Sequence, residues 1–174
     1  MRRVWSTLCV LQIALSVGAC DSGPRALVAR EDACRYCRMT IDDVRFGAMV
    51  MTARGRIETF DSIECLASFV ASIPVSAPPK GIWVADFETP ARWVEVHRAR
   101  FLHLANFRSP MGRDLAAFGQ DVSPEALEQK YGGRVLDWTA VQALIAHDAF
   151  APTGAQATLR PSTAAAGADA PHTH

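Results

Sequence analysis

Runs of apolar residues separated by polar breaks divide the first half of the chain into short elements. Residues 47–60, "GAMVMTARGRIETF", predict two strands joined by a turn at Arg54 and Gly55. Residues 61–73 carry apolar side chains at helical spacing and predict a helix. The apolar run "IWVADF" (82–87) then predicts another strand.

The second half repeats this pattern loosely. Residues 92–96 and 100–105 predict a pair of strands. The further elements expected are a short helix over 111–119, a helix over 123–133 with Ser123 as its N-cap, a strand at Val135 and a last helix over about 138–147. We therefore expect an α+β fold in which two similar ββαβ units pack together.

The N-terminal residues have the pattern of an export signal. Arg2 and Arg3 precede a short apolar run, and "VGAC" ends it in the form of a bacterial lipobox. Cys20 would then carry the lipid, and Asp21 after it favours the inner membrane over the outer one. The expected organisation is a signal peptide (1–19), a lipid anchor and tether (20–33), a first unit (34–88), a second unit (89–150) and a disordered tail rich in Ala, Pro and Thr (151–174).

Charge and cysteine content narrow the function classes. The chain has 18 basic and 18 acidic residues, so no overall positive charge favours nucleic acid. Export would leave three thiols in the mature protein, on Cys34, Cys37 and Cys65. An odd number in an oxidising compartment leaves one thiol unpaired in a monomer, and a free thiol there needs a reason.

The segment "DACRYCRM" (32–39) is compatible with four kinds of site. A zinc site would require a second pair of ligands, and Cys65 stands alone. A thioredoxin-type pair would open a helix, whereas the residues around Cys34 and Cys37 are a poor helix start. A structural disulfide between these two cysteines would close too short a loop to stabilise much.

The fourth kind of site adds Met39. Cys37 and Met39 are two residues apart and would point to the same side of an extended segment. Thiolate and thioether are soft donors that select Cu(I). Met111 lies between Pro110 and Gly112, in a setting typical of an exposed loop, so its thioether could be a third donor.

Other polar residues have more ordinary interpretations. Asp61 is expected to cap the helix over 61–73, with Glu64 completing a capping box. Cys65 is expected to be a buried thiol within that helix. His97 and His103 alternate with apolar residues and are expected to face solvent from strands.

Three segments in a fixed order resemble the NosL family, the lipoprotein accessory factors of nitrous oxide reductase. They are "CRYCRMTIDD", "TFDSIECLASFV" and "SPMGRDLAAFG", and the resemblance covers about residues 20–147. It implies two similar ββαβ units and a Cu(I) metallochaperone that acts in the maturation of the multicopper centre, together with an ABC-type transporter complex. Carried over, it places copper ligation on Cys37, Met39 and Met111, with Cys34 as a further candidate. The family often has glycine where this chain has Arg38.

We therefore expect a periplasmic, lipid-anchored protein that is not an enzyme. It would bind Cu(I) and deliver it to apo nitrous oxide reductase. The alternatives are a thiol–disulfide oxidoreductase that uses Cys34 and Cys37, and a structural lipoprotein with a disulfide. Met111 discriminates between the copper chaperone and the oxidoreductase, because thiol–disulfide chemistry does not need a methionine.

Overall fold

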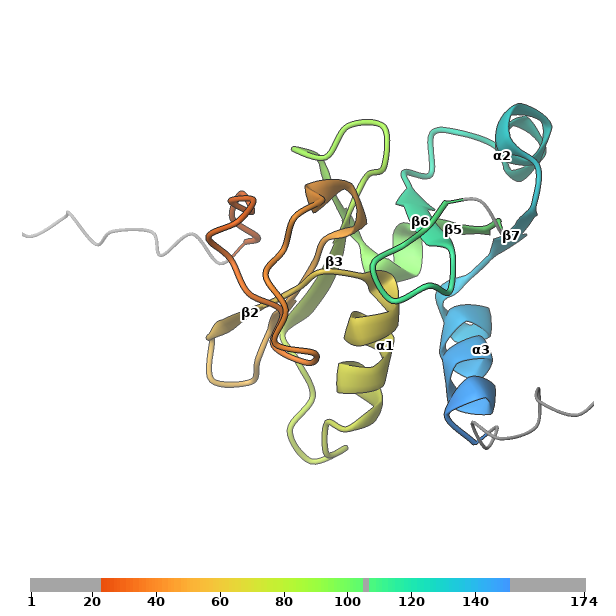
Figure 1. Ribbon diagram of the computed structural model, residues 1–174. Helices are drawn as coiled ribbons and strands as arrows, with labels where there is room; N and C mark the ends of the chain where they lie inside the picture. The colour runs from red at the N-terminus through yellow and green to blue at the C-terminus, as the bar shows by residue number, and fades with distance from the viewer. Residues whose placement is uncertain (1–22, 105–106, 151–174) are drawn as a thin grey trace, which may run out of the picture.

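The computed structural model describes residues 23–104 and 107–150 and shows two small sheets with helices beside them (Figure 1). The expected signal peptide, the lipidation site Cys20 and the tail over 151–174 lie outside the described residues. Within the described part of the chain, no helix is both long and apolar enough to cross a bilayer.

The first sheet is antiparallel, and its strands lie in the order β2-β1-β3-β4. After a short 3-10 helix, η1 (Val44–Phe46), the chain forms β1 (Ala48–Met51), β2 (Ile57–Phe60), α1 (Ile63–Ala71), β3 (Gly81–Ala85) and β4 (Trp93–Glu95). The hairpin turn between β1 and β2 has Gly55 at φ +80°, a conformation that glycine adopts at little cost.

The second sheet is also antiparallel, in the order β6-β5-β7. A second 3-10 helix, η2 (Val96–Arg98), leads into β5 (Arg100–His103), β6 (Leu115–Phe118), α2 (Pro124–Tyr131), β7 (Arg134–Leu136) and α3 (Trp138–Phe150). In each sheet the first strand of a ββαβ series lies between its hairpin partner and the strand that follows the helix. The expected α+β fold with two similar ββαβ units is therefore confirmed.

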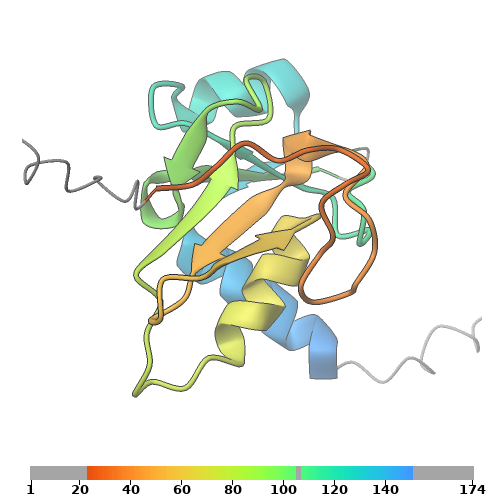
Figure 2. The same cartoon turned by 90° about the vertical axis from the view of Figure 1, so that its left-hand side faces the viewer.

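Two buried hydrophobic clusters join the two units, and the larger one includes α1. Helix α1 lies between the first sheet and α3, as the two views agree (Figures 1 and 2). Leu66 of α1 and Val84 of β3 belong to the same buried cluster as Phe101 of β5 and Val141 of α3. Because α1 contributes to the packing of both units, the position of its N-terminal turn is fixed by the whole domain.

The hairpin and most of the helices form where the sequence predicts them. Strands β1, β2 and β3 and helices α1, α2 and α3 match the expected positions, with Ser123 capping α2. The cap of α1, however, is Ser62 rather than Asp61, because the Ser62 side chain accepts a hydrogen bond from the Cys65 N–H.

Two predictions for the second half were wrong. Residues 92–96 and 100–105 do not pair with each other, because η2 turns the chain between them: β4 pairs with β3, and β5 pairs with β6 and β7. Residues 115–118 form β6 rather than a helix. All four β6 residues are buried, so the segment has no polar alternation to distinguish a strand from a helix.

Candidate metal centre

Three cysteines and one aspartate converge beside the N-terminus of α1. Cys34, Cys37, Asp61 and Cys65 each offer one sulfur or carboxylate oxygen, and these four atoms all lie within 4.8 Å of one another. All three thiols are free. The donors come from two segments: the loop before η1, and the connection from β2 into α1.

The loop over 32–41 folds back on itself to present the two cysteines. The Cys34 N–H donates to the Met39 carbonyl at 2.8 Å, and the Arg38 N–H donates to the Cys34 carbonyl at 3.0 Å. Arg38 has φ +66°, in the left-handed region that favours glycine. Glycine would adopt this conformation at little cost.

Thr59 of strand β2 makes two hydrogen bonds that hold this loop in place. Its Oγ1 donates to the Ala33 carbonyl at 2.9 Å, and its own carbonyl accepts from the Arg35 N–H at 2.8 Å. These two bonds flank Cys34 in the sequence. They set the C-x-x-C loop directly against the strand that leads to Asp61 and Cys65.

Asp61 is buried among the thiols rather than capping a helix. Only 2% of the residue is exposed, and its Oδ2 accepts a hydrogen bond from the Cys37 thiol at 3.3 Å. Its Oδ1 has no hydrogen-bond partner among the described residues. A buried carboxylate oxygen without a partner is costly, and a bound cation would compensate for that cost.

Hydrogen bonding within the cluster separates the thiol pKa values. A bond from the Cys65 thiol lowers the pKa of Cys34 to about 6, despite the opposing effect of burial. The same bond and burial raise the pKa of Cys65. Burial also raises the pKa of Cys37 to about 11. These shifts favour ionisation of the Cys34 thiol over that of Cys37 and Cys65 in the metal-free cluster.

The two methionines expected as ligands lie outside this buried group. Met39 is 53% exposed and Met111 is 40% exposed. Cys37 lies in a turn, so the expectation that Cys37 and Met39 point the same way along an extended segment was wrong in its premise. Met111 lies on the loop between β5 and β6 and lines a pocket of about 220 Å³ together with Cys65 and Tyr36. The fold thus brings Met111 to the same pocket as one of the cluster thiols.

The donor set suits a soft metal ion and admits a second kind of metal. Metal–thiolate bonds of ~2.3 Å correspond to sulfur–sulfur separations of about 3.8–4.0 Å in trigonal or tetrahedral sites, so small side-chain movements would close the cluster around one ion. Sulfur donors favour Cu(I). Three thiolates with a carboxylate also form a four-donor set of the kind that holds zinc. The sequence argued against zinc because no further ligands were evident, and Cys65 and Asp61 now supply them.

Sequence reasoning treated Cys65 and Asp61 as structural residues, yet the structure places both in the cluster. Their four-residue separation across a helix start puts both side chains near the first turn, and this spacing was the available signal. The histidines do not join: His97 is exposed on η2, His103 is half-buried at the end of β5, and neither belongs to the donor group.

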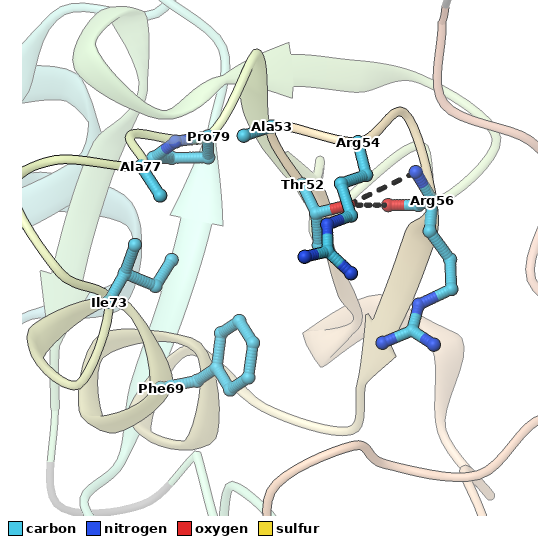
Figure 3. A pocket seen from close by; sticks show the side chains of 8 residues that line it. All are labelled: Thr52, Ala53, Arg54, Arg56, Phe69, Ile73, Ala77 and Pro79. Atoms are coloured by element: carbon cyan, nitrogen blue, oxygen red, sulfur yellow. Dashed lines mark hydrogen bonds between the residues drawn. The ribbon is translucent and has the colours of Figure 1, made fainter.

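A separate groove of about 380 Å³ lies at the opposite end of α1 (Figure 3). Phe69 of α1 and Ile73, which follows the end of that helix, point toward its interior. The turn between β1 and β2 forms the other wall with Arg54 and Arg56. None of the residues that line this groove is a cysteine, methionine, histidine or acidic residue. It therefore offers no thiol, thioether, imidazole or carboxylate donor, and among the described residues the candidate metal centre lies at the N-terminal end of the helix.

The fold and the cluster together define a candidate metal-binding protein with exposed and buried sulfur donors. The NosL family profile matches residues 25–145, and the chain belongs to the NosL family. Its fold is similar to the crystal structure of the copper chaperone NosL from Shewanella denitrificans, with a TM-score of 0.54 and 18% identity. That match covers 67% of this chain and 93% of the other. No curated protein matches the chain. Because the family is not enzymatic, the expectation that this protein is not an enzyme is confirmed.

Replacing Arg38 with glycine should stabilise the metal-free protein. A non-glycine residue in the left-handed region lowers stability by roughly 1–2 kcal/mol, and glycine removes this strain. Glycine also makes the unfolded chain more flexible, which offsets about half of the gain. We therefore expect the free energy of unfolding to rise by about 0.5–1 kcal/mol. Arg35→Gly is the matched control, because Arg35 does not have a positive φ, and it should lower stability. Urea unfolding of both variants measures the effect; a loss of stability in Arg38→Gly would contradict the conformational explanation.

The thiol hydrogen bond should be visible in a pH titration of the reduced, metal-free protein. Ultraviolet thiolate absorbance should show one thiolate forming near pH 6. Cys65→Ala should move this midpoint upward, because Cys34 loses its strongest donor, and Cys34→Ala should abolish it. A wild-type midpoint near the ordinary cysteine value of about 8.5 would show that the bond does not form.

Proposed function

We propose that this protein is a Cu(I) metallochaperone of the periplasm. The observation that carries the proposal is the group of three free thiols beside a pocket that the Met111 thioether also lines. Membership of the NosL family supports it, as does the similarity to a structure described as a copper chaperone.

The exposed sulfurs are the donors that first receive copper. Cys37 is half-buried at the edge of the cluster, and the thioethers of Met39 and Met111 are exposed. Cys34 and Cys65 are almost completely buried, at 2% and 1% exposed. We assign Cys37, Met39 and Met111 to capture and transfer, and the two inner thiols to retention of the ion.

Asp61 has a role in the proton balance of this step. Ligation by Cys37 requires its thiolate, so the thiol proton must leave. Asp61 Oδ2 already accepts the hydrogen bond of that thiol, so it is the first acceptor on the route by which the proton leaves to solvent when the Cys37–copper bond forms. Transfer to a partner then proceeds by ligand exchange: a donor atom of the partner binds the ion before a thioether of the chaperone leaves.

Copper delivered in this way serves the assembly of the multicopper centre of nitrous oxide reductase. The partners are the apo-enzyme and the ABC-type transporter complex that acts with it. Lipidation at Cys20 and the tether over 20–33 hold the protein at the periplasmic face of the inner membrane. The lipobox and Asp21 support this location.

The geometry of the C-x-x-C segment argues against the oxidoreductase alternative. In thioredoxin-type pairs the cysteines open a helix, whose N-terminus activates the exposed thiol. Here residues 35–37 form a turn, and the cysteine with the lowered pKa, Cys34, is the buried one. The thiol with access to solvent, Cys37, has a raised pKa and is a poor nucleophile.

Substitution of the sulfur donors should weaken Cu(I) binding in a graded way. We expect Cys37→Ser to lower the affinity by about a hundredfold or more and Met111→Leu by about tenfold, because a thiolate is the stronger donor for Cu(I). The measurement is a competition titration against a chromophoric Cu(I) chelator under anaerobic, reducing conditions.

Met49→Leu is the matched control, because Met49 is fully buried in β1. It should leave the affinity unchanged. A peptide of residues 30–42 should bind more weakly than the full protein, since it lacks Met111, Asp61 and Cys65. Equal binding by the peptide, or unchanged affinity in Cys37→Ser, would rule out the proposed site.

The location and the recipient can be tested together in cells that make nitrous oxide reductase. Cys20→Ala should move the protein from the membrane fraction to the soluble periplasmic fraction, because the lipid attachment is lost. A strain that lacks the protein should make nitrous oxide reductase with a reduced copper content, measured by elemental analysis of the purified enzyme. Full copper content in that strain would refute the recipient, and membrane retention of the Cys20→Ala protein would refute the anchor.

A further inference from the structure

The loop that carries Met111 is attached to the first unit through one buried carboxylate. Glu64 lies in the first turn of α1, next to Cys65, and is 4% exposed. Its Oε1 accepts a hydrogen bond from the Ser109 hydroxyl and another, at 3.2 Å, from the Arg113 N–H. The two donors lie on either side of Met111 in the sequence, so both ends of the short loop contact the same oxygen.

Internal hydrogen bonds make this loop a compact turn. The Gly112 N–H donates to the Ser109 carbonyl at 2.8 Å, and the Asp114 N–H donates to Ser109 Oγ at 2.9 Å. Gly112 and Asp114 both have left-handed φ values, of +71° and +56°. A turn with these constraints moves as one piece, and Glu64 connects that piece to α1.

We propose that Glu64 is a positioning residue that holds Met111 in place relative to Cys65. The inference rests on the proposed function, since it concerns the geometry of the copper site. Glu64 and Cys65 are consecutive residues of one helix. Hydrogen bonds from the loop to Glu64 therefore also fix the position of the loop relative to the Cys65 thiol. Met111, Glu64 and Cys65 line the same pocket of about 220 Å³.

The energetic cost of Glu64 argues that it does more than fill space. Its Oε2 is buried and has no hydrogen-bond partner among the described residues. Burying a carboxylate with an incompletely satisfied oxygen lowers stability, and an apolar residue would pack here without that cost. What the carboxylate provides in return is the double acceptor at Oε1, which joins a loop of the second unit to a helix of the first.

The test compares Glu64→Ala with Glu64→Gln in the full-length protein. The amide oxygen of Gln can accept both hydrogen bonds, so Glu64→Gln should retain Cu(I) affinity. Glu64→Ala should lose about tenfold, as is typical when a residue that supports a metal ligand is removed. In a Met111→Leu background Glu64→Ala should cause no further loss, because the residue it positions is already absent.

A readout that needs no metal accompanies the titration. In protein labelled with 13C at the methionine methyl groups, Glu64→Ala should shift the Met111 methyl resonance toward the position of a solvent-exposed methionine, and Met49 should not respond. The control is Asp86→Ala, which removes another buried carboxylate that holds a loop, through the Gly119 N–H at 2.9 Å. It should lower stability without changing the Met111 resonance or the affinity.

Three results would overturn the inference: wild-type affinity in Glu64→Ala, an equal loss from Glu64→Ala with and without Met111, or wild-type affinity in Met111→Leu. In each case the chaperone function stands if Cys37→Ser is impaired. A wild-type protein that does not bind Cu(I) would instead contradict the proposed function. The Met111 resonance would then still decide whether Glu64 holds the loop.

Discussion

The metal centre depends on the two hydrogen bonds that Thr59 makes to the C-x-x-C loop. They tie a loop without regular secondary structure to β2, an edge strand of the first sheet, at the point where that strand ends. Two residues further along the chain is Asp61, and four beyond that is Cys65. The end of β2 therefore positions both groups of donors, because the C-x-x-C loop is hydrogen-bonded to it and the start of α1 follows it in the chain.

With the loop held in this position, the sulfur atoms differ in their exposure to solvent. The thiols of Cys34 and Cys65 face the core, Cys37 lies at the boundary, and the methionines lie outside. In such a gradient the buried donors limit the access of solvent and oxidants to a bound ion, whereas the exposed sulfurs remain accessible to another molecule.

Local signals in the sequence were sufficient for the elements whose hydrophobic period is clear. Helix α1 and the hairpin at Gly55 are examples, and Ser123 with Pro124 marks the start of α2. Strand β6 was not predictable in this way, because its four residues are all apolar and buried, so the sequence shows neither the alternation of a strand nor the spacing of a helix. The approach of Cys65 to Cys34 depends on Thr59, a contact that only the folded hairpin creates. The direction of the Met39 side chain depends on the left-handed backbone conformation of Arg38. An arginine in the sequence does not indicate that conformation, so this direction could not be predicted.

The buried clusters that both units share have a consequence for the lifetime of the protein in the cell. Since α1 packs against the first sheet and against α3, the units are expected to unfold together rather than one at a time. An ion that binds only the folded state then stabilises the entire domain, by an amount that rises with the logarithm of the free ion concentration once that concentration exceeds Kd. Proteases that attack unfolded chains would thus remove metal-free molecules faster than metal-bound ones, and the supply of the ion would set how many molecules persist.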